Sequence, residues 1–275
     1  MLAKSSNDCQ TSILQKKMFC SRKLDGVRMM VKWDEKLGKP ITISRGGKNY
    51  DVAATLIIEQ LTDYLSRHKD LILDGELYAH GHYLQEISGI ARLETWEDRC
   101  EILEYWIYDI ADDKRTFNNR YDDLIDLSLD IENNSNYSKI KVVEHVLTEG
   151  WEQIQRLHDK WVSEGFEGLV ARKPDKVYGF GKRGSDMIKV KMYQDDEFEI
   201  IDYQDGLRPE DFTFVCQTKE GKQFAAKPIG DRELKAQYLE NIDNIIGKKG
   251  IVKYFEISKD GIPLQPVFQA VRYDL

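Results

Sequence analysis

A two-residue alternation near the start of the chain constrains the fold most. Apolar side chains stand at every second position from Val27 to Trp33, which is the period of a β-strand with one buried face. A turn around Gly38 leads to a second strand pattern at 41–45, so the two segments predict a β-hairpin. The same reasoning predicts strands at 71–78, 103–110, 168–172 and 187–192, and helices around 57–65 and 154–161.

Two stretches of this first part lack a clear period. The stretch 112–137 is acidic and rich in asparagine, so we expect a weakly ordered excursion with one short helix. The stretch 177–185 is rich in glycine and basic residues, and we expect a loop.

The pattern changes near 192–193. Short strands are predicted at 197–203, 212–218, 223–227, 250–257 and 267–273, with one helix whose apolar face runs from Leu234 to Ile245. Five short strands and one helix in about 80 residues are typical of a small oligonucleotide-binding (OB) barrel. We therefore predict an α/β protein of the α+β type, with antiparallel sheets and flanking helices over 1–192 and an OB-fold barrel over 193–275.

Composition and charge limit the classes of partner that this protein could bind. The 275 residues are 41% hydrophobic and 32% charged, which is typical of a soluble globular protein. The net charge of −8 argues against a protein that holds nucleic acid by bulk attraction. From Arg172 to Lys191, however, seven basic and two acidic residues leave a local charge of +5, so phosphate contacts are expected there, unless the stretch is only a solvated loop.

The N-terminal segment and the cysteines favour the cytoplasm, for a protein encoded by a cell, a virus or a phage. The first twelve residues lack the apolar core of a secretory signal, and no apolar run reaches membrane-spanning length. The four cysteines form no CxxC pair, which argues against a zinc site or a disulfide framework.

The segment from Lys23 to Arg28 is the most informative for chemistry. It places an amine, a carboxylate (Asp25), a glycine and a guanidinium within six residues. A free lysine has a pKa of about 10.4, so a nucleophilic amine needs burial or neighbouring cations.

Several later residues could supply such a site, and each also has a plainer interpretation. Asp74 and Glu76 share one face of a strand, with Gly75 between them as a mark of close ligand approach; the alternative is a surface edge. Lys189 and Lys191 also share a strand face, as a phosphate clamp or as a solvated strand.

Three further positions are candidates. Glu167 could ligate magnesium, although exposed glutamates are common. Tyr108 could stack on a base or fill the core. Arg45 beside two glycines could meet a phosphate, or belong to a plain hairpin loop.

The order of these segments resembles the motif set of the covalent nucleotidyltransferases, the superfamily of ATP-dependent DNA ligases, RNA ligases and mRNA capping enzymes. The segments are Lys23–Arg28, Ser44-Arg45, Asp74-Gly75-Glu76, Tyr108-Asp109, Glu167-Gly168 and Lys189-Val190-Lys191. Within that superfamily the chain most resembles a minimal two-domain ATP-dependent DNA ligase. The resemblance implies that the first domain is an adenylation domain.

The resemblance also implies a role for each residue. Lys23 would attack the α-phosphorus of ATP and carry AMP, while Lys189 and Lys191 bind the α-phosphate. The adenosine would be held by Glu76 at the ribose, Tyr108 on the adenine face and Ser21 at the adenine edge. Glu167 would place Mg²⁺. DNA contacts would come from Arg28, Arg45, Arg172, Lys173, Lys182 and Arg183, with Arg28 and Arg45 also touching the nucleotide.

The resemblance further implies that a monomer uses ATP to seal 5′-phosphate/3′-hydroxyl nicks in duplex DNA, with no membrane partner. An RNA ligase or a capping guanylyltransferase of the same superfamily is the alternative, and a catalytically silent nucleic-acid-binding module is a third. The chain departs from the family pattern at its C-terminal motif. Leu264-Gln265 stand before Pro266-Val267-Phe268, where the family usually has an arginine, and the nearby arginine is Arg272. We also expect no N-terminal helical DNA-binding domain, since few residues precede Lys23.

Overall fold

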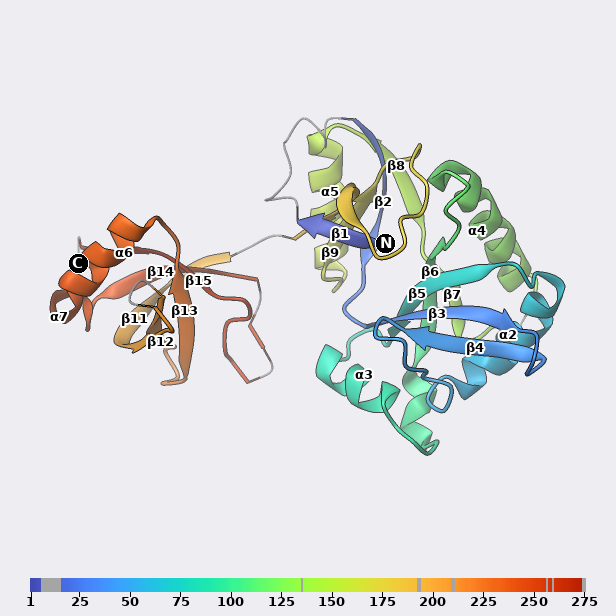
Figure 1. Cartoon of the computed structure of the whole chain (residues 1–275), viewed down its shortest axis with the longest axis horizontal. Coiled ribbons are helices and arrows are strands. Elements are labelled where there is room, and N and C mark those ends of the chain that lie inside the picture. Colours follow the sequence, from blue (N-terminus) through green and yellow to red (C-terminus); the bar gives the residue numbers. More distant parts are fainter. Residues whose placement is uncertain are drawn as a thin grey trace. The chain divides into compact units, whose positions relative to one another are not determined.

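The computed structural model describes residues 1–5, 16–134, 136–191, 194–208, 211–255, 257–258 and 260–273. The chain divides into two compact units, Met1–Lys191 and Met192–Leu275 (Figure 1). Among these described residues, no helix is both long and apolar enough to cross a membrane.

One five-stranded sheet of the first unit has the order β4-β3-β5-β6-β7. Its strands are β3 (Val27–Asp34), β4 (Lys39–Ser44), β5 (Ile72–Tyr78), β6 (Glu104–Ile110) and β7 (Ile140–Val142), and all neighbouring pairs are antiparallel except β6 with β7. The helices α2 (Thr55–Arg67), α3 (Leu84–Ala91) and α4 (Phe117–Glu132) belong to the same part of the chain, together with the 3₁₀ turn η2 (Asp98–Ile102). Alternate strand residues such as Val31, Leu73 and Leu77 are fully buried in its core.

The second sheet has the order β1-β10-β9-β2-β8. Its strands are β1 (Leu2–Ser5), β2 (Lys17–Lys23), β8 (His145–Glu149), β9 (Gly168–Arg172) and β10 (Arg183–Val190). The terminal strand β1 runs parallel to β10, while β10, β9, β2 and β8 are antiparallel neighbours. Helix α5 (Trp151–Ser163) packs Ile154 and Trp161 into this sheet's core.

The predicted hairpin, the four other strands and both helices of this unit are present, but two expectations were wrong. The stretch expected to be weakly ordered forms the 16-residue helix α4. Phe117, Leu124 and Leu127 bury one face of that helix, and the acidic and asparagine residues that suggested disorder lie mainly on its solvent face. Strand β10 also begins at Arg183, inside the stretch expected to be a loop.

The second unit is the predicted barrel. Within its described part, five strands close in the order β11-β12-β13-β15-β14. They are β11 (Gln194–Asp205), β12 (Phe212–Gln217), β13 (Gln223–Pro228), β14 (Lys249–Tyr254) and β15 (Val267–Val271). The one helix expected between β13 and β14 is two, α6 (Arg232–Glu240) and α7 (Ile242–Ile245). An aromatic cluster fills the barrel core, with Phe214 packed against both Tyr238 and Phe268.

Candidate nucleotide-binding site

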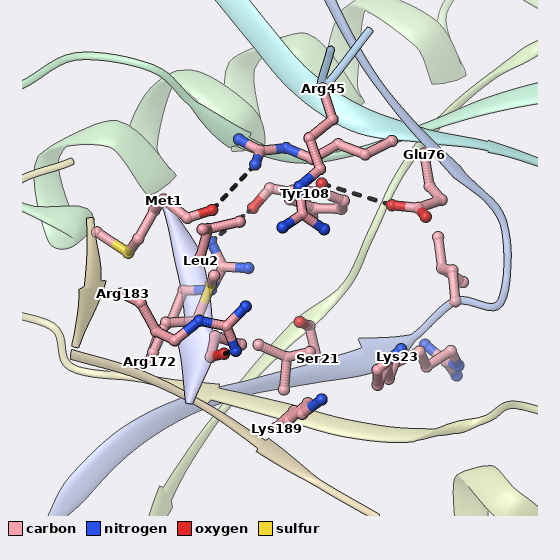
Figure 2. A pocket seen from close by; sticks show the side chains of 16 residues that line it. Met1, Leu2, Ser21, Lys23, Arg45, Glu76, Tyr108, Arg172, Arg183 and Lys189 are labelled. Atoms are coloured by element: carbon pink, nitrogen blue, oxygen red, sulfur yellow. Dashed lines mark hydrogen bonds between the residues drawn. The ribbon is translucent and has the colours of Figure 1, made fainter. Parts of the chain in front are cut away.

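A cavity of about 260 Å³ lies in the first unit, with walls from both of its sheets (Figure 2). Strands β2, β9 and β10 supply one wall, and β3, β5 and β6 supply the other. Nine of the residues predicted from the sequence line it: Ser21, Lys23, Arg28, Arg45, Glu76, Tyr108, Arg172, Arg183 and Lys189. Tertiary structure thus gathers side chains that are up to about 170 positions apart in the chain.

Lys23 ends β2, and sheet pairing explains its neighbours. It stands opposite Gly168 of β9, and its carbonyl accepts a hydrogen bond from the backbone N–H of Glu167 at 3.1 Å. The Lys23 Nζ contacts Glu167 Oε2, and the Lys191 Nζ contacts Oε1 of the same carboxylate. One carboxylate therefore holds two amines side by side.

The surroundings lower the pKa of Lys23 to about 8. Burial is the largest cause, the Lys191 ammonium is the next, and Lys189 adds a smaller effect, while Glu76 and Asp25 act in the opposite direction. A pKa of about 8 leaves roughly a tenth of the amine neutral at pH 7, compared with well under a thousandth for a free lysine. Lys23 therefore has a larger neutral fraction than a free lysine, as the sequence-based prediction of a nucleophile requires.

Glu167 was expected to place a magnesium ion. Its carboxylate is engaged by Lys23 and Lys191. In the described parts of the chain, no three His, Cys, Asp or Glu side chains come together as a ready-made metal cage. Mg²⁺ usually keeps several waters and binds through one or two carboxylates together with substrate phosphates. A single carboxylate beside the basic side chains of the cavity fits that mode of binding.

Glu76 of β5 lines the cavity, and Leu73 and Leu77 are buried in the core. Asp74 of the same strand is 2% exposed, and Arg28 and Tyr178 bind its carboxylate beside the cavity. Burial raises the pKa of Glu76 to about 8, against the opposing effect of Lys23. The prediction that Gly75 marks the close approach of a ligand was wrong. A Cβ there would meet the Trp106 carbonyl oxygen at 2.5 Å, so the close neighbour is strand β6 and not a ligand.

Tyr108 of β6 lines the cavity beside these acids. Its hydroxyl lies 3.4 Å from Asp74 Oδ1 and 3.5 Å from Glu76 Oε2. The Arg172 guanidinium lies 5.7 Å from the centre of the Tyr108 ring. Tyr108 thus faces the cavity, and its ring is half-buried.

Arg28 and Arg45, two of the arginines that line the cavity, differ in how firmly they are held. Arg28 is held by a bidentate pair with Asp74, at 2.8 and 2.9 Å, and by the carbonyl of Met1 at 3.0 Å. Arg45 is exposed just after β4 and reaches the cavity from its rim. Met1 and Leu2 also line the cavity, and sequence reasoning missed them because only the pairing of β1 with β10 brings them there.

The predicted DNA contacts divide into two groups. Arg172 is only 4% exposed, and its Nη1 donates to Asp109 Oδ2 at 2.9 Å. Arg172 thus lies inside the first unit, where it shares Asp109 with Arg120, and a DNA contact from Arg172 stays a prediction. Lys182 and Arg183 are exposed, and Lys173 pairs with Asp186 at 3.2 Å.

Comparisons with known proteins agree with this geometry. The family model described as ATP dependent DNA ligase domain matches residues 1–191. A DNA ligase of African swine fever virus is 29% identical over 260 residues, covering 89% of this chain and 61% of the relative. A DNA ligase of Archaeoglobus fulgidus is 31% identical over 180 residues, covering 62% of this chain and 31% of the relative. The chain thus spans less than two thirds of the length of these relatives.

Solved structures share the fold. A structure from a study of Lig E DNA ligases as a minimal DNA-binding scaffold superposes with a TM-score of 0.74 at 21% identity, covering 99% of this chain and 98% of that one. The adenylate of the Chlorella virus DNA ligase superposes with a TM-score of 0.56 at 21% identity, with 98% of both chains covered. With more than half of its length matched by the family model, the chain belongs to the family of ATP-dependent DNA ligases.

Proposed function

We propose that this protein seals 5′-phosphate/3′-hydroxyl nicks in duplex DNA at the expense of ATP, through a lysyl-AMP intermediate on Lys23. The observation that carries the proposal is the position of Lys23, whose pKa is lowered to about 8 in a cavity that also contains Glu76, Tyr108 and Lys189. A lowered pKa in a cleft beside a charged partner is a mark of a functional lysine.

In the first step, the neutral Lys23 amine attacks the α-phosphorus of ATP. A phosphorus–nitrogen bond forms, the bond to pyrophosphate breaks, and the amine gives up its proton. Lys189 and Lys191 offset the negative charge on the transferring group. Most of the rate enhancement in such a reaction comes from positioning and electrostatics.

In the second step, the 5′-phosphate of the nick takes AMP from Lys23, and in the third the 3′-hydroxyl displaces AMP and closes the strand. Arg28 and Arg45 at the cavity wall suit the phosphates of both substrates. Exposed Phe180, Lys182 and Arg183 offer one aromatic ring and two charges to a DNA backbone. We assign the first unit to adenylation and the barrel to DNA contact.

Glu167 would hold magnesium together with ATP phosphates. The ion would supply positive charge for the departing pyrophosphate. For that role Glu167 would leave at least one of its two lysine partners, and where it leaves Lys23 it would also remove an anion from that amine. We further propose that the enzyme acts as a monomer in the cytoplasm.

Two assays test the proposal. Incubation with ATP labelled at the α-phosphate should give a covalent protein–AMP adduct, and unlabelled protein with ATP and Mg²⁺ should seal a nicked DNA duplex. Lys23→Ala should abolish both, whereas Lys160→Ala on the surface of α5 should change neither. An adduct with GTP would identify a capping enzyme, and preference for nicked RNA would identify an RNA ligase. No adduct with either nucleotide would refute the proposal.

A further inference from the structure

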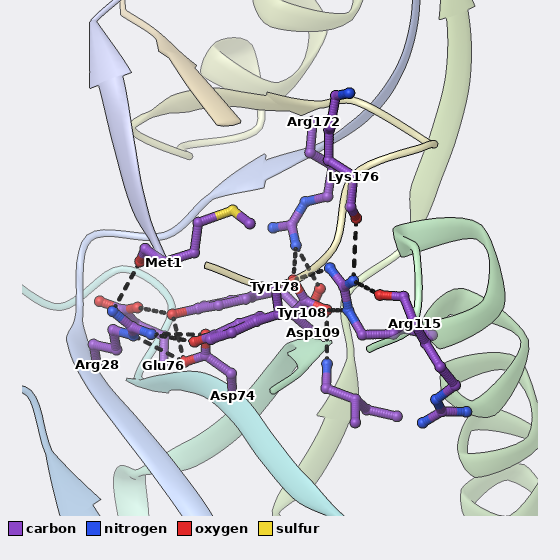
Figure 3. Close-up of polar contacts among 12 residues, drawn as sticks. Met1, Arg28, Asp74, Glu76, Tyr108, Asp109, Arg115, Arg172, Lys176 and Tyr178 are labelled. Carbon is purple, nitrogen blue, oxygen red and sulfur yellow. Dashed lines mark hydrogen bonds and ion pairs between the residues drawn. The ribbon is translucent and has the colours of Figure 1, made fainter. Parts of the chain in front are cut away.

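Three side chains form a closed triangle of hydrogen bonds at the edge of the cavity (Figure 3). Arg28 Nη2 donates to the hydroxyl of Tyr178 at 2.6 Å, that hydroxyl donates to Asp74 Oδ2 at 2.6 Å, and Arg28 donates twice to Asp74. Tyr178 is 1% exposed, so water does not compete for its hydroxyl. The triangle therefore fixes the plane of the Arg28 guanidinium.

Nearly all the donors of Arg28 are used in this arrangement. A guanidinium has five N–H groups. Two go to Asp74, one to Tyr178 and one to the Met1 carbonyl, which leaves one N–H on Nη1. Arg28 lines the cavity, so the remaining Nη1 N–H can donate to a phosphate there. It does so in a fixed direction only while the other four N–H groups keep their contacts.

Tyr178 does not come from the strands that build the cavity. It belongs to the connecting segment 173–182, between β9 and β10. The start of α4 holds this segment: the N–H of Phe117 donates to the Lys176 carbonyl at 2.9 Å, and that of Asn118 to the Pro174 carbonyl at 3.0 Å. These donors of the first helical turn have no partner within the helix, so the segment satisfies them.

A buried cluster of Arg120 and Asp109 also holds the segment 173–182. Arg120 of α4 donates to Asp109 at 2.8 and 3.1 Å, and its Nη1 donates to the Lys176 carbonyl at 3.2 Å. Arg120 and Asp109 are each 1% exposed. Tyr178 is thus presented to Arg28 by a rigid support rather than by a free loop.

We propose that Tyr178 is a positioning residue of the adenylation reaction, which acts by holding Arg28 in the orientation that meets the nucleotide phosphates. This inference rests on the proposed function. It assigns a chemical role to a tyrosine of the basic connecting segment, outside the residues that the sequence motifs single out. A phenylalanine at this position keeps the ring and its packing and removes only the hydroxyl that closes the triangle.

The test is a double-mutant cycle on adduct formation from ATP. Tyr178→Phe should lower kcat of adenylation at least about tenfold, because a hydrogen bond to a charged group orients Arg28. KM for ATP should change less than kcat, since the adenosine contacts come from other residues and Arg28 supplies only part of the phosphate contacts. In an Arg28→Ala background the same change should alter kcat less than about twofold, because the residue through which Tyr178 acts is gone.

The matched control is Tyr121→Phe in α4. It removes a tyrosine hydroxyl that donates to the His145 carbonyl at 3.2 Å. It should leave kcat unchanged. If Arg28→Ala does not fold, as judged by its melting temperature, Arg28→Lys replaces it in the cycle. Equal losses from Tyr178→Phe in both backgrounds, or an unchanged kcat, would overturn the proposal. Failure of the unmodified protein to form any adduct would instead refute the function on which it rests.

Discussion

The pKa of Lys23 depends on its neighbours, and removal of Lys191 tests this dependence most directly. The two amines contact opposite oxygens of the Glu167 carboxylate, and the Lys191 side chain is 9% exposed. After burial, Lys191 is the largest cause of the lowered Lys23 pKa. Lys191→Met removes the charge and keeps an unbranched apolar side chain of similar length.

The expected size of the effect follows from Coulomb's law. Two ammonium groups bound to opposite oxygens of one carboxylate lie roughly 6 Å apart, and at an effective dielectric constant of about 20 they repel by about 3 kcal/mol. That energy corresponds to about two pH units, and solvent near the cavity mouth reduces it to about one. The Glu167 carboxylate, released from Lys191, then favours the charged form of Lys23 and adds to the change.

The midpoint of the adenylation rate against pH should therefore rise by at least about one pH unit. Below the midpoint the rate falls as the amine is protonated, so the variant should lose most at neutral pH and recover in alkaline buffer. The assay is single-turnover adduct formation with labelled ATP from pH 6 to pH 10. The midpoint is the readout, because loss of a phosphate contact also lowers the plateau.

Lys160→Met, on the surface of α5 with its side chain 63% exposed, makes the same charge change away from Lys23 and should leave the midpoint in place. A midpoint for Lys191→Met that stays where it is, or moves to lower pH, would contradict the electrostatic explanation of the Lys23 nucleophile.

Two further predictions concern stability. Gly75→Ala should lower the free energy of unfolding by about 1–3 kcal/mol, because the new Cβ meets the Trp106 carbonyl and the Tyr105 ring, whereas Gly89→Ala in α3 has open space and should stabilise by up to about 1 kcal/mol. Urea denaturation of both variants measures the change in unfolding free energy. Equal changes for Gly75→Ala and Gly89→Ala would contradict the close approach of β6 to Gly75. Arg120→Met should lower the free energy of unfolding by about 2–4 kcal/mol, because it leaves buried Asp109 with Arg172 as its remaining cation. Arg67→Met, at an exposed ion pair with Asp63, should lower it by less than about 1 kcal/mol. Comparable losses for the two arginines in thermal denaturation would show that the buried pair is not the stronger one.

Local sequence was sufficient for most strands and for the barrel. The two-residue period of β3 and β5 separates Arg28 and Glu76, which line the cavity, from core residues such as Val31 and Leu77, while Asp74 is buried beside Arg28. Adjacent strands also bring these three residues together, because Arg28 stands opposite Glu76 in the pairing of β3 with β5. One short helix was expected where the 16-residue helix α4 lies, because acidic residues dominate the composition, while three buried apolar residues at helical spacing determine the structure.

The local residue pattern set the period of each strand and the order of the charged segments, and so it identified the side chains that could bind a nucleotide. Tertiary structure alone decided which of them meet. Pairing of β2 with β9 brings Glu167 to Lys23, pairing of β1 with β10 brings Met1 to Arg28, and burial turns Arg172 inward to Asp109. The physical reason is that strand period is a local property, whereas partner strands and the charges that must be neutralised on burial depend on contacts between residues that lie far apart in the chain.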